Sequence, residues 1–272
     1  MDLSREEQNL ATYDEIGKSY NVTRRADPRI TELIINSLDA PSASVILDVG
    51  AGTGNYSIEL AKHGFEVIAV EPSKIMRETG KKHPGLKWME GVAEQLPAGD
   101  HSVDGIVSTL AIHHFSDLEK AIQEMVRVLK PNGKLVLFLA DPRLCPDDRC
   151  WLKDYFMPII LQSYQAYKPI ETIANLLNSV TNNNVQIVEF PVPYDMEDCF
   201  FVSGWRKPEL YLQNAFRAGV SPLANCPIDI LQPILERLER DLLSGEWDNK
   251  YGHLRSSDTY EGGYRFLIAQ KA

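Results

Sequence analysis

A glycine-rich segment between residues 47 and 56 limits the possible folds of this chain more than any other feature. It reads Leu-Asp-Val-Gly-Ala-Gly-Thr-Gly-Asn-Tyr and continues the apolar run that begins at Val45. A buried strand that passes through glycines into a helix is typical of the ligand-binding turn of parallel α/β folds, because glycine lets the backbone approach a ligand closely. The segment therefore predicts a strand, a turn and a helix that together form a binding site.

Short β-branched runs alternate with helical patterns from residue 45 to residue 140. This alternation predicts βαβ units and a parallel sheet with helices on its faces. Strands are expected at 45–49, 65–70, 86–88, 103–108 and 134–140. The first helix is expected from Asn55 to His63, where Gly64 can end it, and the second lies between Ser73 as N-cap and Gly80.

A third helix is expected to begin at Ser116-x-x-Glu119, which has the spacing of a capping box. Pro131-Asn132-Gly133 is expected to end this helix and to turn the chain into the next strand. The apolar side chains that share one face of the helix should cover the sheet. They are Ile122, Met125, Val126 and Leu129.

The regular alternation stops after Asp141. Two further strands are expected at 185–192 and 264–270, paired at the edge of the sheet. The roughly 70 residues between them carry helical patterns at 208–218 and 228–243, and this is too long for a plain connection. We therefore predict an α/β protein with a Rossmann-like sheet flanked by helices. Residues 1–193 and 263–272 would form the sheet-containing part, and residues 194–262 a helical cap inserted before the last strand.

The composition excludes several classes of protein. The chain has 272 residues, of which 44% are hydrophobic, and a formal net charge of −10. An acidic balance disfavours nucleic acid as a partner, and no apolar run reaches the roughly 20 residues that would cross a membrane. The first residues lack the pattern of a secretory signal, so a cytoplasmic location is expected. Four cysteines without a C-x-x-C pair indicate free thiols rather than a metal site.

An acidic residue, Glu71, follows the glycine turn by about 20 residues, the spacing that places a carboxylate on ribose hydroxyls. A dinucleotide fingerprint would need a third glycine at the position of Asn55. Asp48 would repel a pyrophosphate and favour a ligand that carries an ammonium and a sulfonium group. These residues favour S-adenosylmethionine (SAM) over NAD. An NAD-dependent oxidoreductase or an adenosine-ligand-binding regulator remains the alternative.

Several separated blocks resemble the class I SAM-dependent methyltransferases, in particular their small-molecule group of the methyltransferase type 11 kind. The resemblance implies a SAM-binding enzyme that moves a methyl group to an O, N, C or S nucleophile of a small molecule, and it leaves the substrate and the oligomeric state open. One departure is Val92, where the family commonly has Asp. The matching blocks are Tyr13 to Arg24, Leu47 to Tyr56, Val70-Glu71-Pro72-Ser73, Gly91 to Pro97 and Ser102 to Phe115.

The same resemblance implies a role for each cofactor-binding residue. Some would hold the methionyl part and others the adenosine part, and two near the N-terminus would close over the cofactor's carboxylate. Gly50 and Gly52 would contact the methionyl part, Asp48 its amino group, Glu71 the ribose hydroxyls, and Ala93 and Glu94 the adenine. Ser108 would lie beside the cofactor, Asn55 is a further cofactor-binding residue, and the closing pair would be Tyr20 and Arg24.

His113 and His114 follow the fourth strand, where this kind of fold opens toward its substrate. Either histidine is a candidate general base. The alternative is that one packs locally while the other merely lines the pocket. Arg24, Arg25 and Arg29 form a basic cluster, for which a solvated helix face is favoured over an anion site. Aromatic residues gather after residue 150, and we expect most of them in the core and the remainder in an apolar substrate pocket.

Overall fold

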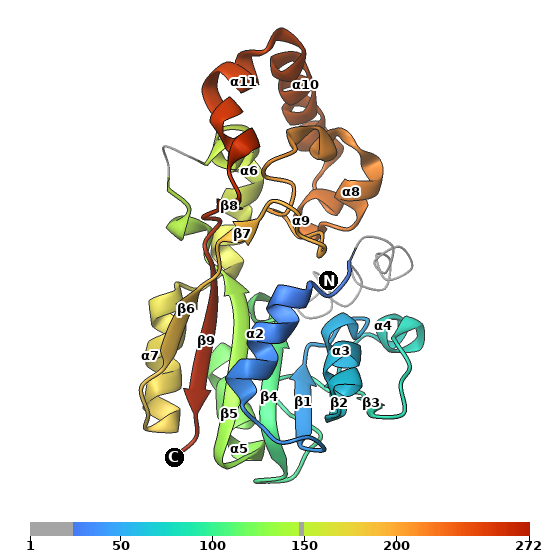
Figure 1. Ribbon diagram of the computed structural model, residues 1–272, viewed down its shortest axis with the longest axis vertical. Coiled ribbons are helices and arrows are strands. Elements are labelled where there is room, and N and C mark those ends of the chain that lie inside the picture. The colour runs from blue at the N-terminus through green and yellow to red at the C-terminus, as the bar shows by residue number, and fades with distance from the viewer. Residues whose placement is uncertain (1–23, 147–149) are drawn as a thin grey trace, which may run out of the picture.

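The protein has two lobes, seen in the computed structural model as a sheet-containing lower lobe and a largely helical upper lobe (Figure 1). The structure describes residues 24–146 and 150–272. Seven strands form the main sheet in the order β3-β2-β1-β4-β5-β9-β6. The first five in that order are parallel, and β9 is antiparallel to both of its neighbours. This is the predicted Rossmann-like sheet.

The strands of the main sheet lie close to their predicted positions. Strand β7 (Val192–Pro193) leaves the main sheet and pairs with β8 (Thr259–Tyr260) in a separate two-stranded sheet. The predicted strand at 185–192 is therefore two short strands. The main sheet consists of β1 (Val45–Val49), β2 (Glu66–Val70), β3 (Leu86–Met89), β4 (Val103–Thr109), β5 (Leu129–Ala140), β6 (Gln186–Glu189) and β9 (Tyr264–Gln270).

Helices cover both faces of the sheet because each buries an apolar stripe. On one face, α2 (Pro28–Leu38) and α3 (Asn55–His63) contribute Ile30, Ile34 and Leu60 to a core shared with the upper lobe. On the other face, α5 (Leu118–Val128) and α7 (Ile170–Thr181) enclose a second core. The short helix α4 (Lys74–Thr79) follows β2.

Two predicted helix signals are confirmed in detail. Gly64 ends α3 in the left-handed conformation, with φ of 109°. The side chain of Ser73 caps α4 by accepting a hydrogen bond from the amide of Met76 at 3.2 Å. Both signals depend only on neighbours along the chain, and this is why they can be recognised from the sequence.

The predicted capping box before α5 is wrong. Asp117 is the N-cap, and its carboxylate accepts from the amide of Lys120 at 3.0 Å. The hydroxyl of Ser116 instead donates to Glu94, 2.8 Å away. Because this tertiary contact occupies Ser116, the helix begins one residue later than expected.

The end of α5 also differs from the prediction. The helix stops at Val128, before Pro131, and β5 begins at once with Leu129, which pairs with Val103. Pairing resumes at Lys134 after an irregularity, within which Asn132 has φ of 63°. Pro-Asn-Gly therefore shapes an excursion inside the strand rather than the helix end. The side chains that α5 buries are Ala121, Ile122, Met125 and Val128, while Val126 is only half-buried.

The upper lobe is built around aromatic side chains. Trp151, at the start of α6 (Trp151–Ala166), is fully buried and makes edge contacts with Tyr211 and Trp247, with ring centroids 5.2 and 5.5 Å away. The prediction assigned residues 151–166 to the sheet-containing part. In the structure, α6 packs against aromatic residues of the upper lobe, and the division into domains stays a prediction.

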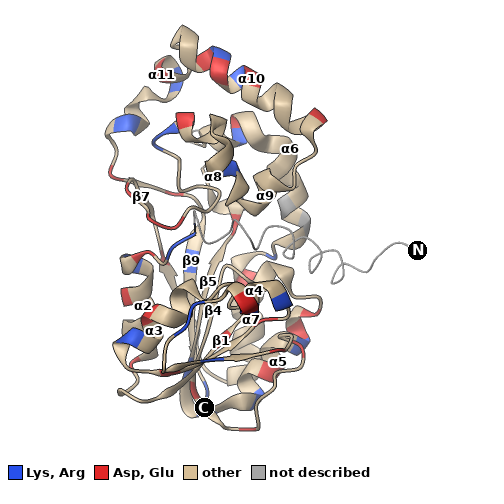
Figure 2. Ribbon diagram, turned by 90° about the vertical axis from the view of Figure 1, so that its right-hand side faces the viewer, with Lys and Arg blue, Asp and Glu red and all other residues tan. Residues whose placement is uncertain are grey.

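The remaining upper-lobe helices follow β7 along the chain. Figure 2 shows acidic and basic residues interspersed along the outermost of them, α10. In the described part of the chain, no helix is both long and apolar enough to cross a membrane. The upper-lobe helices are α8 (Asn214–Ala218), α9 (Ser221–Ala224), α10 (Ile228–Ser244) and α11 (Glu246–Tyr251), with 3₁₀ turns at Pro208–Leu212 and Gly252–Ser256.

Candidate functional site

A pocket opens at the carboxyl ends of β1, β2 and β4, where parallel α/β sheets bind their ligands. It brings together most of the residues that the sequence predicts for a cofactor: Arg24, Asp48, Gly50, Gly52, Asn55, Glu71, Ala93 and Glu94. Tyr20 lies outside the described residues.

The glycine turn has the backbone conformation that only glycine adopts easily. Gly50, Gly52 and Gly54 have φ of 74°, 57° and 75°. The amide of Gly50 donates to the carbonyl of Val70 at 2.9 Å, which ties the turn to the end of β2. A Cβ atom on Gly50 would lie 2.6 Å from the Cβ of Ala111. The turn is therefore packed directly against the loop that follows β4.

Glu71 is held with its carboxylate toward the pocket by two backbone amides. Oε2 accepts from Gly52 at 2.9 Å and Oε1 from Ser73 at 3.0 Å. Burial raises the pKa of Glu71 to about 7, and these two hydrogen bonds oppose the shift. Each carboxylate oxygen can accept a second hydrogen bond. The geometry suits recognition of a pair of hydroxyl donors.

Asp48, at the end of β1, is a second buried carboxylate that lines the pocket. The hydroxyl of Ser57 donates to it. Burial raises the pKa of Asp48 to about 6. A cation placed beside this group would stabilise the ionised form, so two buried carboxylates make the pocket suitable for a positively charged ligand.

Thr109 was missed in the sequence analysis, where the only signal is its position at the end of a predicted strand. Thr109 lines the pocket, and its hydroxyl oxygen is buried without a hydrogen-bond partner among the described residues. A buried hydroxyl without a partner is costly. A polar ligand atom in the pocket would remove this cost. Ser108, predicted to lie beside the cofactor, instead donates to the carbonyl of Val49 at 2.8 Å and does not line the pocket.

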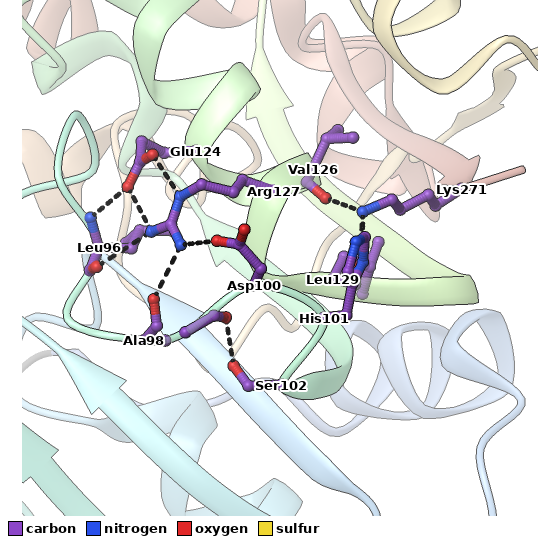
Figure 3. A network of polar contacts seen from close by, with 11 residues as sticks. Leu96, Ala98, Asp100, His101, Ser102, Glu124, Val126, Arg127, Leu129 and Lys271 are labelled. Atoms are coloured by element: carbon purple, nitrogen blue, oxygen red, sulfur yellow. Dashed lines mark hydrogen bonds and ion pairs between the residues drawn. The ribbon is translucent and has the colours of Figure 1, made fainter.

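The loop after β3 brings Ala93 and Glu94 to the opposite side of the pocket. Arg127 of α5 fixes the continuation of this loop, as Figure 3 shows. Its Nη1 donates to the carbonyl of Ala98 at 3.1 Å and to Asp100 at 2.7 Å. Glu124 accepts from the amide of Leu96 at 2.9 Å. Helix α5, on the opposite face of the sheet from α2 and α3, therefore positions the loop that carries Ala93 and Glu94.

Arg24 lines the pocket, but its guanidinium is paired with Asp198, which is almost fully buried. Tyr56, at the start of α3, also donates to Asp198, at 2.9 Å. Asp198 lies in the segment that follows β7, so this contact joins the two lobes. The sequence analysis missed Asp198 because nothing near it in the chain indicates its partners.

The two predicted catalytic histidines differ in their surroundings. His114 lines the pocket, and His113 does not. The ring of His113 stacks on Tyr167, with centroids 4.4 Å apart, and its Nε2 lies 3.4 Å from the Tyr167 hydroxyl oxygen. Of the basic cluster, Arg29 pairs with Asp27 and Asp195. Among the described residues, no group of three His, Cys, Asp or Glu side chains is arranged to hold a metal ion.

Comparison with known proteins identifies the family. Residues 47–137 match a family model described as a methyltransferase domain. A solved structure from Anabaena variabilis, described as a putative methyltransferase from an antibiotic biosynthesis pathway, is 45% identical. It superposes with a TM-score of 0.86, covering 91% of this chain and 98% of the other. The chain belongs to the class I SAM-dependent methyltransferases.

More distant relatives are also methyltransferases. The demethylmenaquinone methyltransferase of Renibacterium salmoninarum is 32% identical over 139 residues, which are 49% of this chain and 59% of the relative. The chain thus spans little more than half the length of this curated relative. A phosphoethanolamine N-methyltransferase of Haemonchus contortus, solved with SAM, is 16% identical and superposes with a TM-score of 0.56. The alignment covers 97% of this chain and 57% of the other. At this level of identity it shows only that the fold is similar.

The pocket of this methyltransferase fits SAM, the cofactor of its family. Two buried carboxylates line it and suit a ligand that carries an ammonium and a sulfonium group. Thr109, whose hydroxyl oxygen has no partner among the described residues, lines the same pocket. NAD would place its negatively charged pyrophosphate beside Asp48 and Glu71, and like charges repel. The NAD-dependent alternative is therefore not favoured.

Proposed function

We propose that this methyltransferase transfers a methyl group from SAM to a nucleophilic atom of a small molecule. The observation that carries the proposal is a pair of buried carboxylates that line the pocket. Asp48 lies near the carboxyl end of β1, and Glu71 directly follows β2. Glu71 would hold the ribose hydroxyls, Asp48 the ammonium group, and the loop with Ala93 and Glu94 the adenine. Bound SAM supplies a methyl group activated by the positive charge on sulfur.

The chain's own residues contribute alignment and exclusion of water. The glycine turn allows close approach, and the two amides on Glu71 keep its carboxylate oriented. His114 is the histidine that reaches the pocket, and it would accept a proton only from an acceptor that must lose one. We propose that residues 194–262, together with α6, bind that acceptor. An acceptor of small-molecule size is in keeping with the description of the Anabaena relative.

Calorimetry with S-adenosylhomocysteine and with NAD tests the cofactor assignment. S-adenosylhomocysteine should bind the wild-type protein and NAD should not. Glu71→Ala should weaken the binding of S-adenosylhomocysteine by about 1–3 kcal/mol, because charge-assisted hydrogen bonds are lost. Glu66→Ala is the matched control, since Glu66 is exposed at the other end of the same strand. Equal affinities in the two variants would contradict the role of Glu71.

The acceptor is sought by incubating the protein with methyl-labelled SAM and fractionated metabolite pools. His113→Ala and His114→Ala should then be assayed separately across pH with the acceptor that is found. A loss of rate of about 10²–10⁴-fold in one variant, together with loss of the acid limb, would assign a histidine base. Unchanged profiles in both would leave alignment as the source of catalysis.

A further inference from the structure

A second cavity lies between the lobes, next to the pocket already described. It opens where β5 ends at Ala140 and β9 begins at Tyr264. Leu152 and Ile160 of α6 form another side of it, and Val202 closes it from the upper lobe. In Figure 1 these elements meet at the junction of the two lobes. The cavity therefore faces the carboxyl edge of the sheet, as the first pocket does.

The lining of this cavity is mainly apolar. Aliphatic, aromatic and thiol side chains make up most of it, including Cys145 and Cys150, both buried. Among the described residues, Lys153 is the one charged residue that lines it, and its ammonium group donates to the carbonyl of Cys145 at 2.5 Å. Because burying a charge without a partner is costly, this lining favours an uncharged ligand.

Three aromatic rings separate the two spaces. His114 lines the first pocket, and Tyr167 lines the second. Between them lies His113, with its ring centroid 3.9 Å from that of His114 and 4.4 Å from that of Tyr167. One short stretch of chain also contributes to both linings, since Asp198 lines the first pocket and Phe201 the second. The second cavity is therefore joined to the cofactor pocket by a continuous row of three rings, His114, His113 and Tyr167.

We propose that the second cavity binds the apolar body of the methyl acceptor, an uncharged aromatic or aliphatic small molecule. Its nucleophilic atom would reach the cofactor pocket past His113 and Tyr167. This proposal rests on the proposed function, which supplies the methyl donor. The chemical class follows from the lining, whereas the cofactor assignment follows from Asp48 and Glu71, so the two can fail separately.

Binding of N-phenyl-1-naphthylamine, a neutral apolar dye, tests the cavity. The wild-type protein should raise its fluorescence saturably, and Val202→Phe, which fills the cavity, should weaken binding at least tenfold. Leu243→Phe is the control, because Leu243 is 84% exposed on α10. All three proteins should keep the same affinity for S-adenosylhomocysteine. Equal dye affinity in Val202→Phe and wild type would overturn the proposal, while failure of S-adenosylhomocysteine to bind would overturn the proposed function instead.

A second measurement needs no variant. Cys145 and Cys150 line the cavity, whereas the half-buried Cys226 does not. The uncharged reagent N-ethylmaleimide should label the two cavity thiols in the folded protein, and the dye should slow this labelling at least fivefold without slowing that of Cys226. Unslowed labelling, or no labelling of the native cavity thiols, would overturn the proposal.

The acceptor class itself is read from the reaction product. After incubation with methyl-labelled SAM and a cell extract, the label should pass into ethyl acetate at neutral pH. Val202→Phe should transfer at least tenfold less label than Leu243→Phe. Label that stays in the aqueous phase would overturn the assignment of an uncharged apolar acceptor.

Discussion

The two lobes are stabilised in different ways. In the lower lobe, strands pair in register with their neighbours, and helices such as α3 begin and end at residues with clear local signals. In the upper lobe, short helices and 3₁₀ turns are held by contacts between aromatic rings, for example that of Trp151 with Trp247. A hydrogen-bonded sheet places its strand ends through backbone contacts, whereas the shape of a packed cluster of rings depends on which side chains are present.

This difference suggests how the work is divided. A common cofactor requires the same geometry in many enzymes, and we propose that the lower lobe provides it. Acceptors vary, and variable segments on a fixed framework carry specificity. The buried contact of Asp198 with Arg24 and Tyr56 is where the two lobes depend on each other.

The largest effect is expected for Asp198→Ala. It should lower the free energy of unfolding by about 3–5 kcal/mol, because it removes one half of a largely buried ion pair. Denaturant unfolding measures this. Asp195→Ala is the control. Asp195 lies in the same segment as Asp198, is 55% exposed and pairs with Arg29, and exposed ion pairs contribute little to stability. If the two variants were equally stable, the lobes would not be coupled through Asp198.

Gly50→Ala should destabilise the lower lobe by about 3 kcal/mol. About 1–2 kcal/mol comes from the left-handed backbone and the remainder from overlap with Ala111. Binding of S-adenosylhomocysteine should be lost as well. Gly99→Ala, where an added Cβ meets nothing within 4 Å, should match wild type in both measurements. Retained ligand affinity in Gly50→Ala would show that the turn tolerates displacement.

A pair of tryptophans tests whether cofactor binding belongs to one lobe. Trp247→Phe should cost about 2 kcal/mol of stability, as a large side chain is trimmed in a packed core, and should leave S-adenosylhomocysteine affinity within twofold. Trp88→Phe should weaken that affinity, because the Trp88 ring packs against Gly54 of the glycine turn. Calorimetry on both variants decides. The reverse pattern would assign cofactor binding to the upper lobe.

A smaller effect is expected from pH. The raised pKa of Glu71, about 7, means that the folded protein retains a proton that the unfolded chain loses above its ordinary value of 4.5. The contribution of Glu71 to stability should therefore decrease as pH rises from about 4.5 to 7. Ribose hydroxyls need the ionised form, so S-adenosylhomocysteine affinity should rise about tenfold from pH 6 to pH 8. Glu71→Gln should reduce this rise, and an unchanged slope would contradict the assignment.

Predictions from the sequence succeeded where neighbours along the chain determine the outcome. The helix over 55–63, its end at Gly64 and the cap at Ser73 are such cases. The main strands were also predicted, because a buried parallel strand is a continuous apolar run. Most of the cofactor residues predicted by resemblance line one pocket.

The failures share a physical cause, which is competition from distant partners. Glu94 takes the hydroxyl of Ser116 and moves the start of α5 to Leu118. Asp198 lies 174 positions from Arg24, so no local pattern indicates their pairing. The contacts of Trp151 with Tyr211 and Trp247 likewise join residues far apart in the chain, so no local pattern indicates them.

The position of β9 has a consequence for the order in which the chain folds during synthesis. This strand is the last of the sheet along the sequence, yet it lies between β5 and β6. Until residues 264–270 leave the ribosome, β5 presents an unpaired edge and β6 has no neighbour in the sheet. A nascent chain halted before residue 264 would thus expose a long apolar strand edge, which favours aggregation. Completing the sheet waits for residues 264–270, which follow every other helix and strand of the described structure.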